Sequence, residues 1–356
     1  MRLIKMEQIK SIQGIRLLAI LCIFLSHTVA FLDIYNNSLF SCLGGSGVFT
    51  FFMISGFLLS FKKRIIEKKQ NKEVFVCAWK KVNKYYTLYV ITLLFALIAK
   101  FPTTVNDFVL TFVKGIFALS LTQSFVPHVG IVNSLNGPAW FLSALFGIWI
   151  INYSYPKLIN YFSSKVGLNS CPKIFLGILL LQCAFFSILK FVPYSRIPID
   201  KIVYYGWLTY YNPIFCYSIY LEGVLLGRYC NLRIVKINYQ KWLQLFTVIL
   251  TIFVLCNRHI FYYVPLVVII EILVFGGVCS VMTPGTIGES LLSSKIAVYL
   301  GNISGYIFLI HGVVNYNLRS YFQPYIQGKY LFVMSIVITL FFSIITDLVY
   351  KKKKQD

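Results

Sequence analysis

Residues 47–69 read GVFTFFMISGFLLSFKKRIIEKK, an apolar run that ends in a cluster of basic residues. With the residues before it, the apolar part predicts a span at 43–61, which is long enough to cross a bilayer as a helix. An unbroken run favours a helix, because the strands of a membrane barrel alternate apolar and polar residues. The basic part is typical of a loop that stays on the cytoplasmic side of a membrane.

The whole chain has a similar composition. Of its 356 residues, 58% are hydrophobic and only 12% are charged, whereas about a quarter of a soluble domain is charged. Lipid admits only helices and closed barrels. We therefore expect an all-α, polytopic integral membrane bundle of about ten transmembrane helices. The predicted spans are 14–33, 43–61, 85–101, 138–155, 174–192, 210–228, 242–258, 260–282, 297–318 and 330–350.

One further apolar segment, 107–123, is short and carries Asp107 and Lys114. The basic loops 62–84 and 228–241 are both predicted to be cytoplasmic, so an even number of spans must connect them. Counting 107–123 as a span would give an odd number, which predicts that it is re-entrant or interfacial. Both termini are then cytoplasmic. The chain forms a single transmembrane domain at 1–350, followed by a basic tail at 351–356.

The net charge of +22 is explained by membrane topology. Its Lys and Arg residues gather in short loops between apolar runs, as in a membrane protein that follows the positive-inside rule. We therefore expect a lipid bilayer as partner and no nucleic acid. The nine cysteines include no C-x-x-C pair, and no cluster of His, Cys and carboxylates has the spacing of a metal site, so no metal is expected.

Arg16 and His27 are eleven residues apart in the first predicted span. Eleven residues of helix return almost to the same face, about 16 Å further along the axis. The two side chains cannot touch, but they could bind two ends of one long ligand. Ionisable groups within lipid are costly and commonly functional. Two other interpretations stay open, namely an interfacial Arg16 that helps to set topology, and a buried His27 hydrogen-bonded to a neighbouring helix.

Other polar residues within apolar runs allow two interpretations. Ser55 and Gly56 are small residues that favour close helix packing, and they do not form a G-x-S-x-G nucleophile motif. Glu222 and Glu271 each need a partner or a water-filled cavity, and Arg16 and Lys190 are possible partners. The same choice between a functional and a structural role holds for His311, which either lines a site or bonds across a helix contact.

Five stretches of the sequence resemble a known family, in that family's order along the chain. Residues 14–27 contain an Arg, ten further residues and a His. The stretch 51–59, FFMISGFLL, is followed by 137–142, GPAWFL, with Trp140 at a helix start. The last two are 225–228, LLGR, and 300–311, which begins LGNISGY and ends at His311. Together they resemble the acyltransferase-3 family of integral membrane acyltransferases.

This resemblance implies an acyl-CoA donor, most simply acetyl-CoA, on the cytoplasmic side and a carbohydrate hydroxyl as acceptor. His27 would act as a base or as a transient acyl acceptor, because histidine gains and loses a proton near neutral pH. Arg16 would bind the phosphates of CoA. Ser55, Trp140, Glu222, Glu271 and His311 are the further candidates for residues that line the site.

The sequence departs from the family pattern before the third span. The family has an R-x-x-R element there, whereas this chain has Lys81 and Lys84 at the matching positions. Lysine binds phosphate as a point charge and lacks the two-pronged geometry of arginine. The resemblance implies that both lysines contribute to CoA binding, and the other interpretation is that they only mark a cytoplasmic loop.

The sequence therefore predicts a membrane-bound O-acyltransferase that moves an acyl group, expected to be acetyl, from acyl-CoA to a cell-surface or lipid-linked polysaccharide. The expected location is the cell membrane of a bacterium, with other glycan-assembly proteins as possible partners. The main alternative is a polysaccharide exporter or flippase without acyl-transfer chemistry. It is disfavoured because the chain lacks an inverted repeat with matching broken helices. A membrane scaffold within a glycan-assembly complex is a third interpretation.

Overall fold

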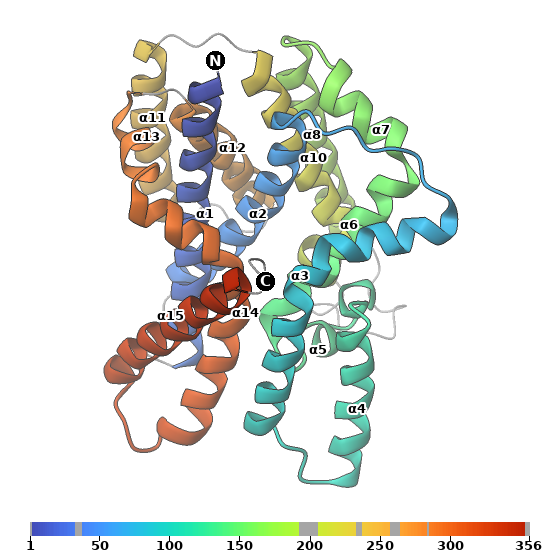
Figure 1. Cartoon of the computed structure of the whole chain (residues 1–356), viewed down its shortest axis with the longest axis vertical. Helices are drawn as coiled ribbons and strands as arrows, with labels where there is room; N and C mark the ends of the chain where they lie inside the picture. Colours follow the sequence, from blue (N-terminus) through green and yellow to red (C-terminus); the bar gives the residue numbers. More distant parts are fainter. Residues whose placement is uncertain are drawn as a thin grey trace.

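The structure is a computed structural model that describes residues 2–32, 38–191, 206–232, 237–256, 264–282 and 285–352. Every regular element in these ranges is a helix, which confirms the all-α fold class (Figure 1). Part of the predicted tail, 353–356, lies outside the described residues. So do 33, 192, 257–258 and 260–263 of four predicted spans and 233–236 of a predicted loop.

The long helices are α1 (Arg2–Phe31), α2 (Ser38–Phe61), α3 (Asn71–Ala99), α4 (Val105–Leu119), α6 (Trp140–Ser154), α8 (Ser170–Phe191), α10 (Pro213–Leu232), α11 (Ile237–Cys256), α12 (Val264–Val281), α14 (Lys295–Phe322) and α15 (Gly328–Lys352). Short helical elements connect them: η1 (Gln123–Phe125), α5 (Val129–Val132), η2 (Gly137–Ala139), α7 (Pro156–Asn160), η3 (Tyr161–Lys165), η5 (Trp207–Tyr211) and α13 (Ile287–Leu292).

Six helices in the described part of the chain are long and apolar enough to cross a bilayer, which makes the protein a multi-pass helical membrane protein. They are Lys10–Phe31, Leu43–Phe61, Asn71–Ala99, Ser170–Leu189, Lys295–Phe322 and Gly328–Lys352. The other four predicted spans coincide with α6, α10, α11 and α12. The count of ten spans, the single-domain division and the cytoplasmic placement of the termini stay predictions.

The third predicted span, 85–101, begins too late. Helix α3 starts at Asn71, so residues 71–84, which the sequence predicts to be loop, are helical. The start is set by a capping box, in which the side chain of Glu73 accepts from the backbone N–H of Gln70 (3.2 Å). A run of lysines indicates contact with water but does not prevent a helix, because a membrane helix can extend beyond the bilayer.

Helix α4 covers most of the segment predicted to be re-entrant or interfacial. Its 15 residues span about 22 Å, which is shorter than the hydrocarbon core of a bilayer. Ala118 is the buried residue of this helix, and most of its apolar side chains are exposed. Helices α3 and α4 form one hairpin at the lower end of Figure 1, and α14 and α15 form another.

Helix α2 packs between α1 and α10 (Figure 1). Glycines allow the close contact with α10, since a Cβ on Gly56 would overlap the carbonyl oxygen of Tyr220. A Cβ on Gly223 would likewise overlap the carbonyl oxygen of Met53. The packing role predicted for Gly56 is thereby confirmed. Helices α1 and α10 thus hold α2 in place, and α14 packs on the other side of α1.

Candidate functional site

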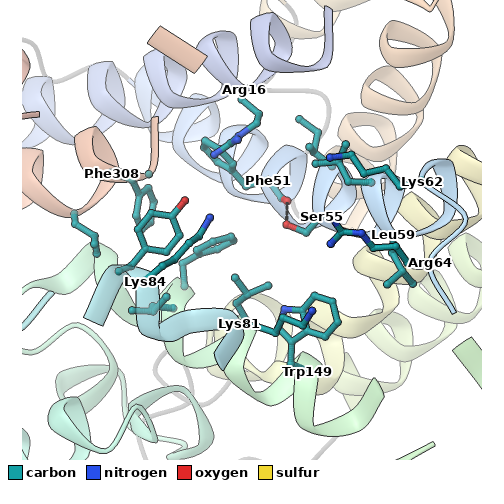
Figure 2. A pocket seen from close by; sticks show the side chains of 18 residues that line it. Arg16, Phe51, Ser55, Leu59, Lys62, Arg64, Lys81, Lys84, Trp149 and Phe308 are labelled. Carbon is teal, nitrogen blue, oxygen red and sulfur yellow. Dashed lines mark hydrogen bonds between the residues drawn. The ribbon is translucent and has the colours of Figure 1, made fainter. Parts of the chain in front are cut away.

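The first cavity, which we name the cationic cavity, has a volume of about 290 Å³ and lies between α1, α2, α3, α6 and α14. Five of its 18 lining residues are basic, and no Asp or Glu belongs to this described lining. Figure 2 shows these basic side chains, which come from separate segments and face a common space. They are Arg16, Lys62, Arg64, Lys81 and Lys84.

Local contacts hold three of the five cations. Arg16 donates from Nη1 to Oε1 of Gln13 (2.9 Å), one turn earlier in α1. The Lys81 ammonium lies 4.7 Å from the centre of the Trp149 ring, and the Lys84 ammonium lies 4.4 Å from that of Tyr85. These cation–π contacts fix the directions of the two lysines and leave their charges uncompensated.

Burial and neighbouring positive charges change the pKa of Lys62, which directly follows the last residue of α2. Partial burial lowers the pKa of Lys62 below the ordinary lysine value, and the charges of Arg64 and Arg16 lower it further. An anion bound in the cavity would reverse the effect of these neighbouring charges. The cationic cavity therefore has electrostatics that favour a bound anion.

The second cavity, the histidine cavity, has a volume of about 200 Å³. It is lined by His27, Phe31, Val48, Asn133, Gly137, Pro138, Trp140, Tyr210, Tyr211, Phe308 and Tyr316. Trp140 packs against Tyr210 and Tyr211, with ring centres 5.0 and 4.8 Å apart. The amide of Asn133 donates to the hydroxyl of Tyr211 (2.9 Å). The cavity thus combines aromatic faces with polar tips around one imidazole.

His27 is half-buried and contacts a second histidine from α14. Its Nδ1 lies 2.8 Å from Nε2 of His311, and the two rings are parallel to within 1°. His311 is fully buried, and its Nδ1 lies 3.1 Å from the carbonyl oxygen of Ile307. The packing of α1 against α14 therefore creates a chain of contacts from a backbone carbonyl through two imidazoles to the histidine cavity.

The two cavities adjoin at Phe308, which lines both. On α1, Arg16 lines the cationic cavity, whereas His27 and Phe31 line the histidine cavity. Helix α6 repeats this order with Trp149 and Trp140, and α2 has Ser55 on one side and Val48 on the other. Between them the rings of Phe51, Phe141 and Phe308 contact one another, with centres 5.3 to 6.3 Å apart.

The structure brings together most of the residues that the sequence singled out. Arg16, Lys81, Lys84 and Ser55 line the cationic cavity, where Ser55 donates its hydroxyl to the carbonyl oxygen of Phe51 (2.8 Å). His27 and Trp140 line the histidine cavity, and His311 contacts His27 directly.

Glu222 and Glu271 lie elsewhere, in a buried cluster between α8, α10 and α12. Gln182 donates to Oε1 of Glu222 (3.0 Å) and to Oε1 of Glu271 (3.4 Å). Neither glutamate lines the cationic or the histidine cavity. Arg16, which the sequence allowed as their partner, lies in the cationic cavity instead, and the side chain of Lys190 lies outside the described part of the structure.

Sequence reasoning missed several lining residues. Lys62 and Arg64 were assigned only to the topology of a basic loop, although both face the cationic cavity. The sequence could have identified them, because both directly follow a span that contains the site candidate Ser55. Nothing in the sequence identified Asn133 as a lining residue, because an isolated amide in a loop is common. Among the described residues, no group of three or more His, Cys, Asp or Glu is placed to hold a metal ion.

These features define a membrane protein in which a cavity lined by five basic residues adjoins a histidine cavity inside a helix bundle. A family model described as an acyltransferase domain matches residues 9–348, nearly the whole chain. The chain belongs to the acyltransferase-3 family and is a membrane acyltransferase. No curated protein and no solved structure matches the chain.

Proposed function

We propose that the protein takes an acyl group, expected to be acetyl, from acyl-CoA and transfers it to a hydroxyl of a polysaccharide destined for the cell surface. The observation that carries this proposal is the junction at Phe308 of two cavities with different chemistry. One cavity offers five cations to a polyanion, and the other offers an imidazole to a hydroxyl.

The cationic cavity fits the polar part of CoA. The pyrophosphate and the ribose phosphate of CoA carry several negative charges, which match Arg16, Lys62, Arg64, Lys81 and Lys84. Leu58, Leu145 and Phe308 supply an apolar wall along which the uncharged arm of CoA would lie. Arg16 and His27 are separated by about 16 Å along α1, so one extended molecule would reach from the phosphate cluster to the imidazole.

The histidine cavity fits a sugar. Tyr210, Tyr211 and Trp140 present flat apolar faces with hydrogen-bonding tips, which suit a ring that has C–H faces and hydroxyl edges. In the proposed reaction, His27 removes the proton of the acceptor hydroxyl while its oxygen attacks the thioester carbonyl carbon. A C–O bond forms and the C–S bond breaks. The proton taken up by His27 then passes to the departing thiolate, which leaves as CoA thiol.

This arrangement supports transfer across the membrane, with the donor entering from the basic, cytoplasmic side and the acceptor from the other. The acyl group would cross while the CoA and the polysaccharide stay on their own sides. An exporter without chemistry, the alternative from the sequence, has no need of a cation cluster beside a histidine.

The deciding experiment is mass spectrometry of the surface polysaccharide from wild-type, deletion and His27→Ala strains. We expect the O-acyl mass to disappear in both mutants while the yield of polymer is kept. The matched control is His128→Ala, because His128 lines neither the cationic nor the histidine cavity. The acyl mass itself identifies acetyl or a longer group.

Two results would contradict the proposal. Loss of the polymer from the surface would favour the exporter. Unchanged acylation in a His27→Ala protein that is shown to be folded in detergent would remove His27 from the chemistry.

A further inference from the structure

We propose that His311 is a positioning residue that holds His27 in the tautomer required of a base, with its free lone pair on Nε2 in the histidine cavity. This inference rests on the proposed function for its catalytic meaning. Its structural part stands on the contacts between the two imidazoles alone.

The argument begins at a group whose hydrogen-bonding role is fixed. The carbonyl oxygen of Ile307 can only accept, so Nδ1 of His311, 3.1 Å away, must carry a proton. A neutral imidazole has one N–H, which leaves a lone pair on Nε2 of His311. That nitrogen lies 2.8 Å from Nδ1 of His27 and can only accept from it. His27 therefore carries its proton on Nδ1.

The orientation of His27 completes the argument. Its Nδ1 edge faces the fully buried His311, while the residue itself lines the histidine cavity. The unprotonated Nε2 is thus the nitrogen available to an acceptor hydroxyl. A histidine in water favours the opposite tautomer, so the hydrogen bond from His27 to His311 must set this one.

In the described part of the structure, apolar rings pack against His311. Phe24 and Phe308 lie against its ring, with centres 6.1 and 5.9 Å away. A neutral partner suits this position because a carboxylate within lipid would be costly to keep ionised. When His27 takes up a proton during transfer, His311 can keep accepting from Nδ1 without having to change its own protonation.

The test uses nitrogen NMR of the full-length protein labelled with ¹⁵N-histidine in detergent or nanodiscs. The chain contains only four histidines, so the signals are few, and the spectrum of a His27→Ala variant assigns those of His27. In the wild type we expect His27 and His311 both to carry the proton on Nδ1. In His311→Leu we expect His27 to shift toward the Nε2–H tautomer.

Kinetics supply the second readout. We expect His311→Leu to lower kcat at least about tenfold, because a misplaced proton removes the general base, with little change in KM for acyl-CoA. His311→Gln keeps an acceptor oxygen and is expected to recover part of kcat and the Nδ1–H signal of His27. If His311 had a purely structural role, the tautomer of His27 would stay the same in His311→Leu, and His311→Gln would not recover kcat.

A matched control breaks the neighbouring polar contact between the same two helices. Asn315 donates to the hydroxyl of Thr28 (3.0 Å), next to His27 in sequence but outside the imidazole pair. Asn315→Leu should lower thermal stability and leave both the tautomer and kcat near their wild-type values.

The outcomes separate this inference from the proposed function. An Nε2–H signal for His27 in the wild type, or an unchanged tautomer and kcat in His311→Leu, would overturn the positioning role. A His27→Ala protein that still transfers acyl groups would overturn the proposed function, even if the tautomer were as expected.

Discussion

Arg16 is half-buried in α1, and its guanidinium lies 6.0 Å from the centre of the Phe51 ring in the cationic cavity. If it binds a phosphate of CoA, Arg16→Gln removes a charged hydrogen bond worth about 1.5–3 kcal/mol. We expect the Kd for CoA, measured by calorimetry, to rise about 10- to 100-fold. Arg16→Lys should lose less, because the charge remains while the two-pronged geometry is lost.

The control for this prediction is Lys68→Gln, because Lys68 is an exposed lysine between α2 and α3 that does not line the cavity. Removing a positive charge outside the cavity should raise the Kd for CoA only slightly, and added salt should abolish this effect. Equal weakening of CoA binding by both substitutions would mean that Arg16 acts only through net charge.

Single residues could be predicted from the sequence where chemistry and spacing coincide. Arg16 and His27 are unusual residue types within an apolar run, and their helical spacing places them on one face. The partner of His27 could not be predicted, because 284 residues separate it from His311 and only the packing of α1 on α14 brings them together. Glu222 and Glu271 were wrongly grouped with the site for the same reason. An ionisable residue within lipid indicates that it has a polar partner, but the sequence does not say which residue that partner is.

At the scale of elements, glycines decide how α2 and α10 pack. Gly223→Ala would place a methyl group against the backbone of Met53, where no side chain can move aside. We expect the variant to lose about 1–3 kcal/mol of stability, as for an overpacked core, and its melting temperature in detergent to fall. Circular dichroism during heating measures it.

Gly177→Ala in α8 is the matched control, because a Cβ at that position meets nothing within 4 Å. Alanine is the better helix former, so this variant should be neutral or slightly stabilised. A loss of stability in Gly177→Ala equal to that in Gly223→Ala would contradict the packing argument.

Elements were largely predictable, because the length and composition of apolar runs specify membrane helices. All ten predicted spans coincide with helices in the described part of the chain. Boundaries were less predictable, as the early start of α3 at Asn71 shows. Hydropathy reports where lipid ends, whereas capping and hydrogen bonding decide where a helix ends.

At the scale of the whole molecule, Phe308 is the side chain that both cavities share, and it is buried against Phe51 and Phe141. Under the proposed function these rings also separate the two sides of the membrane. Phe308→Ala should open a water path between them. We expect proteoliposomes with this variant to lose an imposed pH gradient several-fold faster than those with the wild type.

Ile310→Ala is the control for this measurement, because Ile310 is buried on the same helix and lines neither cavity. Its loss of volume should not affect the gradient. Equal leakage from both variants would show that a loosened α14, rather than the ring of Phe308, is responsible.

The uncompensated charge of the cationic cavity also bears on how long the protein persists in a cell. Five like charges held around one space repel one another, and this repulsion favours unfolding of the empty protein. A bound polyanion acts as their counterion and favours the folded form in proportion to its concentration. Under the proposed function, we therefore expect starvation for acyl-CoA to shorten the lifetime of the protein, so that its abundance follows the supply of acyl-CoA.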